Sequence, residues 1–290
     1  MKHIFLVNSF GLKEKTAIVL DKIREVAKKL KLDFEIEINS EIRSTEDILE
    51  NYKDSENIIF AIGGDGIINR VLNSIVGTKN VLGYIPYGTG NDFYRCNKEL
   101  LKQGINKIDL VQINDRYFIN IACFGIDADI ANNDEIIHSK HIPKKERYNI
   151  SLLYNFIKYR AREATVEIDE DTYLDKYTTI AVCNGRYYGG GYKIAPTSEL
   201  DDGLLDVYLV RKMPKISMAR LIMSMKDAKH EKSPRVNKIQ TDKLVIRSEK
   251  EIASNIDGEV LTAKEFNIKI IPKGIKVYYD EELINKLKEW

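Results

Sequence analysis

The first part of the chain alternates short apolar runs with segments whose apolar residues recur at helical spacing. The apolar runs predict buried strands at residues 3–8, 34–38, 57–62 and 81–85. The helical patterns fall between them, through residue 30, at residues 45–52 and after Gly66. This alternation is typical of a doubly wound α/β domain, in which ligands bind at the carboxyl ends of mostly parallel strands. We expect this domain to span residues 1–113.

From residue 116 onward the pattern changes to segments rich in β-branched and aromatic residues. These segments predict strands at residues 116–126, 164–169, 177–185, 204–211, 243–248, 266–272 and 275–279. Two helical patterns interrupt them, at residues 148–161 and 215–229. We expect an all-β sandwich or barrel, favouring a β-sandwich-like domain, at residues 114–277. The last residues, 278–290, predict a short amphipathic helix that packs back on the first domain.

Three glycines lie where the third strand turns into a helix. Gly63, Gly64 and Gly66 follow the apolar run and precede helically spaced isoleucines. Glycine lets another molecule approach the backbone closely, and the free N–H groups of a helix start favour anions such as phosphate. Asp65 between them would repel phosphate unless a cation lies in between. The turn is therefore either a metal–nucleotide site or a plain glycine turn with a capping aspartate.

A second glycine turn, Gly88 to Asp92, follows the next strand, so both turns are expected at one sheet edge. Further along, Asp201 and Asp202 precede Gly203, while Asp257 and Glu259 flank Gly258. Each of these is either a ligand-binding motif or a hairpin turn, because Asp-Gly is the strongest hairpin signal. Between them stand three consecutive glycines at 189–191, which a strand edge keeps only where another group comes very close.

The composition excludes several classes of protein. The 290 residues are 43% hydrophobic and 31% charged with a net charge of +1, which suits a two-domain globular protein and no nucleic-acid partner. Three cysteines, spread along the chain, favour a reducing compartment without disulfides. No apolar run is long enough for a signal peptide or a membrane span, so we expect a cytoplasmic protein. His138 and His141 lack further ligands and favour a solvated loop over zinc.

These motifs, in this order, resemble the diacylglycerol kinase catalytic-domain family. The chain is similar to its soluble bacterial lipid kinases, which also resemble sphingosine and ceramide kinases. The motifs that carry the resemblance are "GGDGIIN", "PYGTGNDFYR", "KIDLVQINDRYFINIACFGIDA", "NGRYYGGGYKIAPTSELDDGLLDV" and "NIDGE". NAD kinases and phosphofructokinases share the first turn but not the fourth block.

The resemblance implies an ATP- and Mg²⁺-dependent kinase and a role for each matching residue. ATP phosphates would contact the first strand's Asn8 and the glycine turn, and the nucleotide would contact Thr89; the turn comprises Gly63, Gly64, Asp65, Gly66, Ile67, Ile68 and Asn69. A magnesium–water network would involve Asp65, Asp92 and Asp109, and a further metal would bind Asp202 with the carbonyls of Glu199 and Leu204. Glu259 would accept the proton of the substrate hydroxyl. These roles suit phosphoryl transfer, which needs charge neutralisation, alignment and a base.

Three departures from the family pattern stand near the glycine turn. Ile67 replaces a usual threonine, Arg70 replaces a usual glutamate, and the first-strand motif is a shortened "NSFG". Asn39 or Ser40 stands where a nucleotide-contacting threonine is usual. Sphingosine kinases also have an apolar residue matching Ile67. We therefore keep two hypotheses, a kinase for a membrane lipid, diacylglycerol first and a sphingoid base second, and a catalytically weak nucleotide-binding regulator.

A lipid substrate implies a peripheral protein at the inner face of an anionic membrane; a homodimer is left open. Residues 211–238 hold nine Lys or Arg against two acids. Within them Met218, Leu221, Ile222 and Met225 form one helical apolar stripe. The stripe either reaches the membrane or packs on the β-domain beneath a basic face. We expect docking on anionic lipid through this segment.

Overall fold

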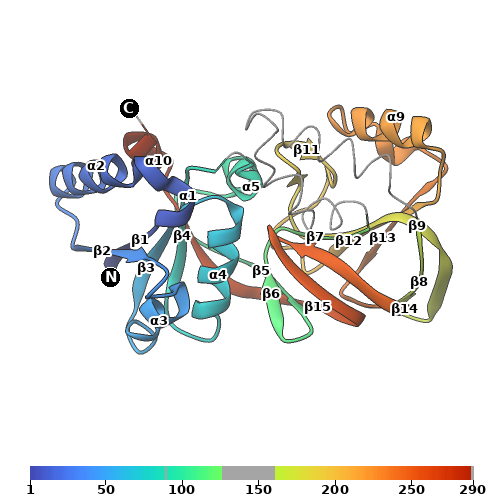
Figure 1. Ribbon diagram of the computed structural model, residues 1–290, viewed down its shortest axis with the longest axis horizontal. Coiled ribbons are helices and arrows are strands. Elements are labelled where there is room, and N and C mark those ends of the chain that lie inside the picture. The colour runs from blue at the N-terminus through green and yellow to red at the C-terminus, as the bar shows by residue number, and fades with distance from the viewer. Residues whose placement is uncertain (89, 126–160, 289–290) are drawn as a thin grey trace.

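The computed structural model describes residues 1–88, 90–125 and 161–288 (Figure 1). Thr89, His138, His141 and all but the last residue of the helix predicted at 148–161 lie outside these residues. Two layered parts follow one another along the long axis of the molecule. They share a continuous set of hydrogen-bonded strands, so the chain passes between them without a free linker.

The first part is built on parallel strands in the order β2 (Phe34–Asn39), β1 (Lys2–Asn8), β3 (Asn57–Gly63) and β4 (Val81–Pro86). Alternate side chains of these strands enter two separate cores, because helices cover both faces. One core holds α3 (Thr45–Glu50), α4 (Asp65–Ile75) and α5 (Asp92–Leu100). The other holds α2 (Thr16–Lys29) and the C-terminal α10 (Glu281–Lys288). Between β1 and α2 lie α1 (Ser9–Leu12) and a 3-10 turn, η1 (Lys13–Lys15).

The second part wraps antiparallel strands around an apolar core. Its strands are β5 (Gly104–Ile113), β6 (Arg116–Phe118), β7 (Ile121–Gly125), β8 (Arg162–Ile168), β9 (Asp171–Cys183), β12 (Leu205–Arg211), β13 (Val236–Thr241), β14 (Lys243–Ile256) and β15 (Glu259–Tyr279). A small hairpin, β10 (Tyr187–Tyr188) with β11 (Tyr192–Lys193), stands apart. The helix α9 (Lys215–Met225) and the 3-10 turn η2 (His230–Lys232) complete it. The predicted combination of a doubly wound α/β domain and a β-sandwich-like domain is confirmed.

Two predicted strand patterns differ from the structure. The strands expected at 266–272 and 275–279 are one long strand, β15, whose register shifts between Ile271 and Ile275. Its last residues pair with β4 in parallel, Val277 beside Leu82, so the expected boundary after residue 277 falls inside this strand. The run expected at 116–126 is instead split into β6 and β7, because the backbone between them donates hydrogen bonds to Asp257.

Candidate active site

The two glycine turns pack against each other at the carboxyl edge of the sheet. A Cβ atom on Gly88 would lie only 2.5 Å from the Cα of Gly64, so the second turn leaves no room for a side chain at Gly88. The carbonyl of Gly63 accepts the N–H groups of Tyr87 and Gly88 at 2.8 and 3.0 Å. The hydroxyl of the buried Tyr84 donates to the same carbonyl at 3.0 Å. The expectation that both turns share one edge is confirmed.

This contact brings together two carboxylates, one at the start of each following helix. Asp65 begins α4 and Asp92 begins α5, and the N–H of Asp92 lies 3.5 Å from Oδ2 of Asp65. Burial and the neighbouring Asp92 raise the pKa of Asp65 to about 6, and burial also raises the pKa of Asp92. Within the described residues, the buried Oδ1 of each has no hydrogen-bond partner; Arg95 stands 3.8 Å from that of Asp92.

These unpartnered oxygens fit a magnesium ion. Mg²⁺ is commonly held by one or two carboxylates, with waters and substrate phosphates completing its shell. In the described part of the chain, no three His, Cys, Asp or Glu side chains gather as a complete metal cage. A pair of buried carboxylates at two helix starts is therefore suited to a metal that arrives with phosphate, as the helix N-termini also favour an anion.

The three-glycine segment closes over Asp92. The N–H of Gly190 donates to Oδ2 of Asp92 at 2.8 Å. Gly189, Gly190 and Gly191 have φ values of 67, 85 and 107°, a region that favours glycine. A Cβ atom on Gly191 would lie 3.2 Å from Nε of Arg95. The close approach predicted from the glycine run is thus an approach to α5.

Glu259 reaches the first glycine turn on a tight hairpin. Ile256 pairs with Glu259, which leaves Asp257 and Gly258, with φ values of 49 and 92°, as the two turn residues. The hairpin interpretation of this motif is therefore right. The turn is fixed because the buried Asp257 carboxylate accepts three backbone N–H bonds, from residues 119, 120 and 121. A Cβ on Gly258 would lie 3.2 Å from the backbone nitrogen of Gly66, so this turn packs against the start of α4.

The Glu259 carboxylate is paired with Arg70, one turn into α4. Nε of Arg70 donates to Oε1 of Glu259 at 3.0 Å, and the same oxygen lies 3.1 Å from where a Cβ of Gly66 would be. Both side chains line a cavity of about 680 Å³, together with Asn69 and Arg116. The cavity also reaches the loop before α3. The ion pair spans the junction of the two parts, because each partner comes from a different one.

The remaining residues of the glycine turn face inward. Ile67 and Ile68 are 3% and 1% exposed and belong to the core beneath α4. Only the backbone groups of these two residues can therefore contact a ligand. The Asn69 amide donates to the Tyr117 carbonyl at 3.0 Å and joins α4 to β6. At the end of β1, Cβ of Asn8 lies 3.3 Å from the Cβ position of Gly63. The structure thus brings Asn8 beside the turn.

Asp109 occupies a different position from the Asp65–Asp92 pair. It is fully buried, and its two oxygens accept the N–H groups of Gly203 and Lys273, each at 2.7 Å. These bonds tie β5 to the turn before β12 and to the bulge of β15. Among the hydrogen bonds of the described residues, none joins Asp109 to Asp65 or Asp92.

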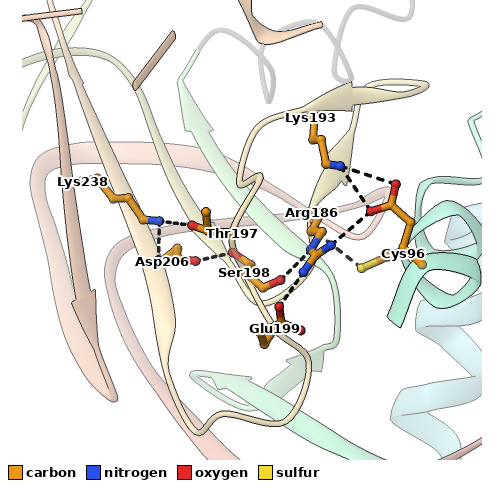
Figure 2. A network of polar contacts seen from close by, with 9 residues as sticks. Cys96, Arg186, Lys193, Thr197, Ser198, Glu199, Asp206 and Lys238 are labelled. Carbon is orange, nitrogen blue, oxygen red and sulfur yellow. Dashed lines mark hydrogen bonds and ion pairs between the residues drawn. The ribbon is translucent and has the colours of Figure 1, made fainter. Parts of the chain in front are cut away.

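The predicted second metal site lies on the turn before β12. Oδ1 of Asp202 accepts the N–H of Leu204 at 3.0 Å, and burial raises the pKa of Asp202. The carboxylate of Glu199 is engaged by Arg186 at 2.6 Å (Figure 2). The same guanidinium reaches Glu99 of α5 at 3.2 Å and so links the two parts of the molecule. A metal at Asp202 stays a prediction.

Sequence reasoning missed several polar residues that support these turns. Asn91 adopts a left-handed φ of 53° and bonds both the N–H and the carbonyl of Gly88. The tolerance of asparagine for this conformation, in a glycine-rich turn, was the available signal. Asp206 is 3% exposed in β12, where it meets the hydroxyl of Ser198 and, at 3.1 Å, the ammonium of Lys238 (Figure 2). Strand alternation alone gave no signal for this buried charge.

Comparisons with known proteins agree with this arrangement. Residues 2–115 match the diacylglycerol kinase catalytic domain, and residues 120–279 match the YegS C-terminal NAD kinase beta sandwich-like domain. A diacylglycerol kinase of Bacillus subtilis is 28% identical over 222 residues, 70% of this chain and 71% of that protein. A Yersinia enterocolitica protein named "Probable lipid kinase YegS-like" is 30% identical over 240 residues, 75% of this chain and 77% of that one.

A solved structure extends the agreement to the fold of nearly the whole chain. A diacylglycerol kinase from Bacillus anthracis superposes with a TM-score of 0.69 at 19% identity, over 97% of this chain and 98% of that one. The resemblance inferred from the motifs is confirmed. With both domain models matched in order, the chain belongs to the diacylglycerol kinase catalytic-domain family, with a YegS-type C-terminal domain.

Proposed function

We propose that the chain is a lipid kinase that transfers the γ-phosphate of ATP to the hydroxyl of a membrane lipid, diacylglycerol before a sphingoid base. The observation that carries the proposal is the convergence at the start of α4. The Asp65–Asp92 pair lies at the glycine turn, and the Glu259 carboxylate reaches Gly66 of the same turn. Family membership and the names of the relatives support the same reaction class.

The nucleotide would bind where backbone N–H groups and cations are exposed together. The start of α4 favours phosphate, and Gly63, Gly64 and Gly66 allow it to approach. The neighbouring cavity of about 680 Å³ is large enough for the rest of a nucleotide. Asn69, Arg70 and Arg116 line it. By the family pattern, Thr89 would contact the nucleotide. These residues do not distinguish ATP from GTP as the phosphate donor.

Asp65 and Asp92 are the residues that would hold magnesium, with Asp109 and Asp202 added by the family pattern. When bound, magnesium neutralises phosphate charge as the phosphoryl group moves. The protein itself keeps these two buried carboxylates together. Among the described ion pairs, the nearest cationic group is Nε of Arg95, 3.8 Å from Oδ1 of Asp92. That arrangement is costly for an empty site and favourable for a cation, because like charges repel in a buried environment.

Glu259 would accept the proton of the lipid hydroxyl as the new P–O bond forms. A general base needs a fixed position within hydrogen-bond reach of the proton. The Asp257 anchor and the tight hairpin supply this fixed position. In the structure Oε1 of the carboxylate accepts the Nε–H of Arg70, and we expect Arg70 to turn toward the nucleotide phosphates during catalysis. Its side chain is about half exposed and lines the cavity, which leaves it a path.

The same ion pair favours the second candidate, a catalytically weak nucleotide-binding regulator. An arginine that stays on Glu259 would keep the base from the substrate. Ile67, by contrast, gives this alternative no support, because its side chain is packed in the core beneath α4. The outcome depends on which partner Arg70 prefers once nucleotide is bound.

The test is transfer of labelled γ-phosphate from ATP to lipid in the presence of magnesium. The purified chain is given a total lipid extract and, separately, diacylglycerol or sphingosine in vesicles, and the labelled products are identified. A kinase labels one lipid class, with phosphatidic acid expected from diacylglycerol. Nucleotide binding without any labelled lipid would favour the regulator. We propose a peripheral location at the inner face of the cytoplasmic membrane, because the substrate stays in the bilayer. Among the described residues, no helix is long and apolar enough to span a membrane.

A further inference from the structure

The helix α9 lies at the end of the molecule opposite α2 (Figure 1). Its stripe of Met218 and Leu221 is 3% and 8% exposed, and Met225 packs against the apolar cluster that includes Tyr208. Three of the four residues of the stripe that could have reached a membrane, all but the half-buried Ile222, are therefore turned toward the protein, and Met225 contacts the β-sandwich. This settles which face of the helix is turned outward.

The outward face of α9 carries two large apolar side chains. Ile216 and Met223 are 70% and 72% exposed. They are seven residues apart, so they lie two turns apart on the same side, roughly opposite the buried stripe at about 100° per residue. Single exposed apolar residues are ordinary on protein surfaces. An aligned pair suggests a binding surface only when the residues around it suit the same partner. The residues around Ile216 and Met223 meet this condition.

Cations flank this apolar pair on both sides. Lys215 and Lys226 fall on one side of the line from Ile216 to Met223, and Arg220 falls on the other. The helix contains no acidic residue. In the described part of the chain, neither Lys215 nor Arg220 takes part in an ion pair, whereas Lys226 lies over the Tyr192 ring, 5.6 Å from its centroid.

The acids that follow the helix are already neutralised. Asp227 pairs with Lys229 at 3.1 Å, and Glu231 meets Lys238 at 3.6 Å and the hydroxyl of Tyr208 at 2.6 Å. Among the described residues, the unpaired charges on and next to α9 are therefore positive. An apolar line bordered by cations is the pattern of a helix that lies in the interface of an anionic bilayer, with its apolar side chains among the acyl chains.

We propose that the outward face of α9, made of Lys215, Ile216, Arg220, Met223 and Lys226, docks the protein on an anionic lipid bilayer. The proposal deepens the proposed function, since it rests on a substrate that stays in the membrane. Two apolar side chains and three cations give reversible binding, because each cation near an anionic surface contributes about fivefold in affinity. Salt weakens such binding by screening. An enzyme that docks this way can leave one membrane region for another.

The test is co-sedimentation of the full chain with vesicles of phosphatidylcholine alone or mixed with phosphatidylglycerol, at low and high salt, without ATP. The variant Lys215→Gln/Arg220→Gln/Lys226→Gln is expected to lower binding to mixed vesicles roughly 100-fold. Ile216→Ser/Met223→Ser is expected to lower it at least about tenfold at both salt concentrations. The matched control, Lys22→Gln/Lys28→Gln/Lys29→Gln, removes the same charge from α2 and is expected to bind like wild type.

Equal losses in the control and in the α9 charge variant would overturn the proposal, as would wild-type binding to neutral vesicles that matches binding to mixed ones. Thermal unfolding checks that every variant is folded. Kinase activity is measured separately on short-chain diacylglycerol dispersed in detergent, where the α9 variants are expected to match wild type. Selective loss of vesicle binding by an inactive protein would uphold the docking face and reject the proposed function. Kinase activity together with unchanged vesicle binding by the α9 variants would uphold the proposed function and reject the docking face.

Discussion

The hydrogen bond between Arg70 and Glu259 is the contact on which the two functional hypotheses differ. In a kinase, Arg70 leaves the carboxylate and contacts the nucleotide phosphates. Arg70→Ala is then expected to raise the KM for ATP roughly tenfold with kcat changed much less, because a charge-assisted hydrogen bond to phosphate is lost. Initial rates across ATP concentrations measure both constants. The exposed Arg24, which pairs with Asp21 on α2, supplies the control variant Arg24→Ala. A rise in kcat of tenfold at unchanged KM would instead identify Arg70 as a lock on the base.

Asp65 is one of the two residues that we propose hold magnesium. Asp65→Ala removes one of two buried carboxylates that repel each other, so the metal-free protein is expected to stay folded and unfold at no lower temperature. Magnesium is expected to raise the unfolding temperature of wild type but not of the variant, because the cation loses a ligand. Asp202→Ala, on the exposed turn before β12, tests the second site in the same titration. A wild-type magnesium response in either variant would reduce that aspartate to a turn former.

At the scale of elements, the packing of the two glycine turns is sensitive to a single methyl group. Gly88→Ala places a Cβ 2.5 Å from the Cα of Gly64, whereas Gly64→Ala meets only a 3.5 Å contact. Gly88→Ala is expected to lower the free energy of unfolding by about 1–3 kcal/mol, since backbone must move. Gly64→Ala is expected to cost less than half as much. Denaturant titration compares the two; equal losses would show that the turns do not pack as described.

The turn η2 carries a buried histidine that makes folding sensitive to acid. His230 is 2% exposed, Nε2 lies 2.6 Å from the Ile194 carbonyl, and burial lowers its pKa below 6.5. The unfolded chain therefore binds a proton before the folded one, and stability falls as the pH drops through and below about 6.5. Glu231 opposes this lowering and Lys238 adds to it.

His230→Gln is expected to flatten the loss of unfolding free energy between about pH 7.5 and about pH 5.5, because glutamine does not titrate in this range. His3, whose pKa burial also lowers, stays in both proteins and cancels in the comparison. Identical pH slopes for variant and wild type would remove His230 from the acid sensitivity of the fold.

Most elements of the first part are predictable from the sequence, because parallel strands covered on both faces are continuous apolar runs. The elements of the second part are less predictable from the sequence. Residues 272–274 look like a strand break, yet the chain continues through them as a bulge, where a Cβ atom on Gly274 would lie 2.8 Å from Cβ of Leu110. The split between β6 and β7 depends on Asp257, far away in sequence, whose carboxylate takes the N–H groups at the break.

At the scale of the whole molecule, the candidate site exists only because the two parts meet. Motif order identifies Asp65, Asp92 and Glu259 as candidates, and the sheet edge predicts that the first two lie close. The contact of Glu259 with Arg70 could not be predicted, because it depends on where the β14–β15 hairpin lands on α4. Arg186, which joins Glu99 to Glu199, shows the same limit: its partners lie on elements far apart in sequence.

The central claim is that this meeting point transfers phosphate with Glu259 as the base. The most direct test is the rate of γ-phosphate transfer from ATP to diacylglycerol vesicles by wild type and by Glu259→Gln, with ATP affinity measured for both. Turnover is expected to fall by about 10²-fold or more, because a positioned base contributes 10²–10⁴, while the affinity for ATP stays within about threefold. Transfer by the variant at near wild-type rate, with ATP bound equally well, would contradict the account and remove Glu259 from the reaction.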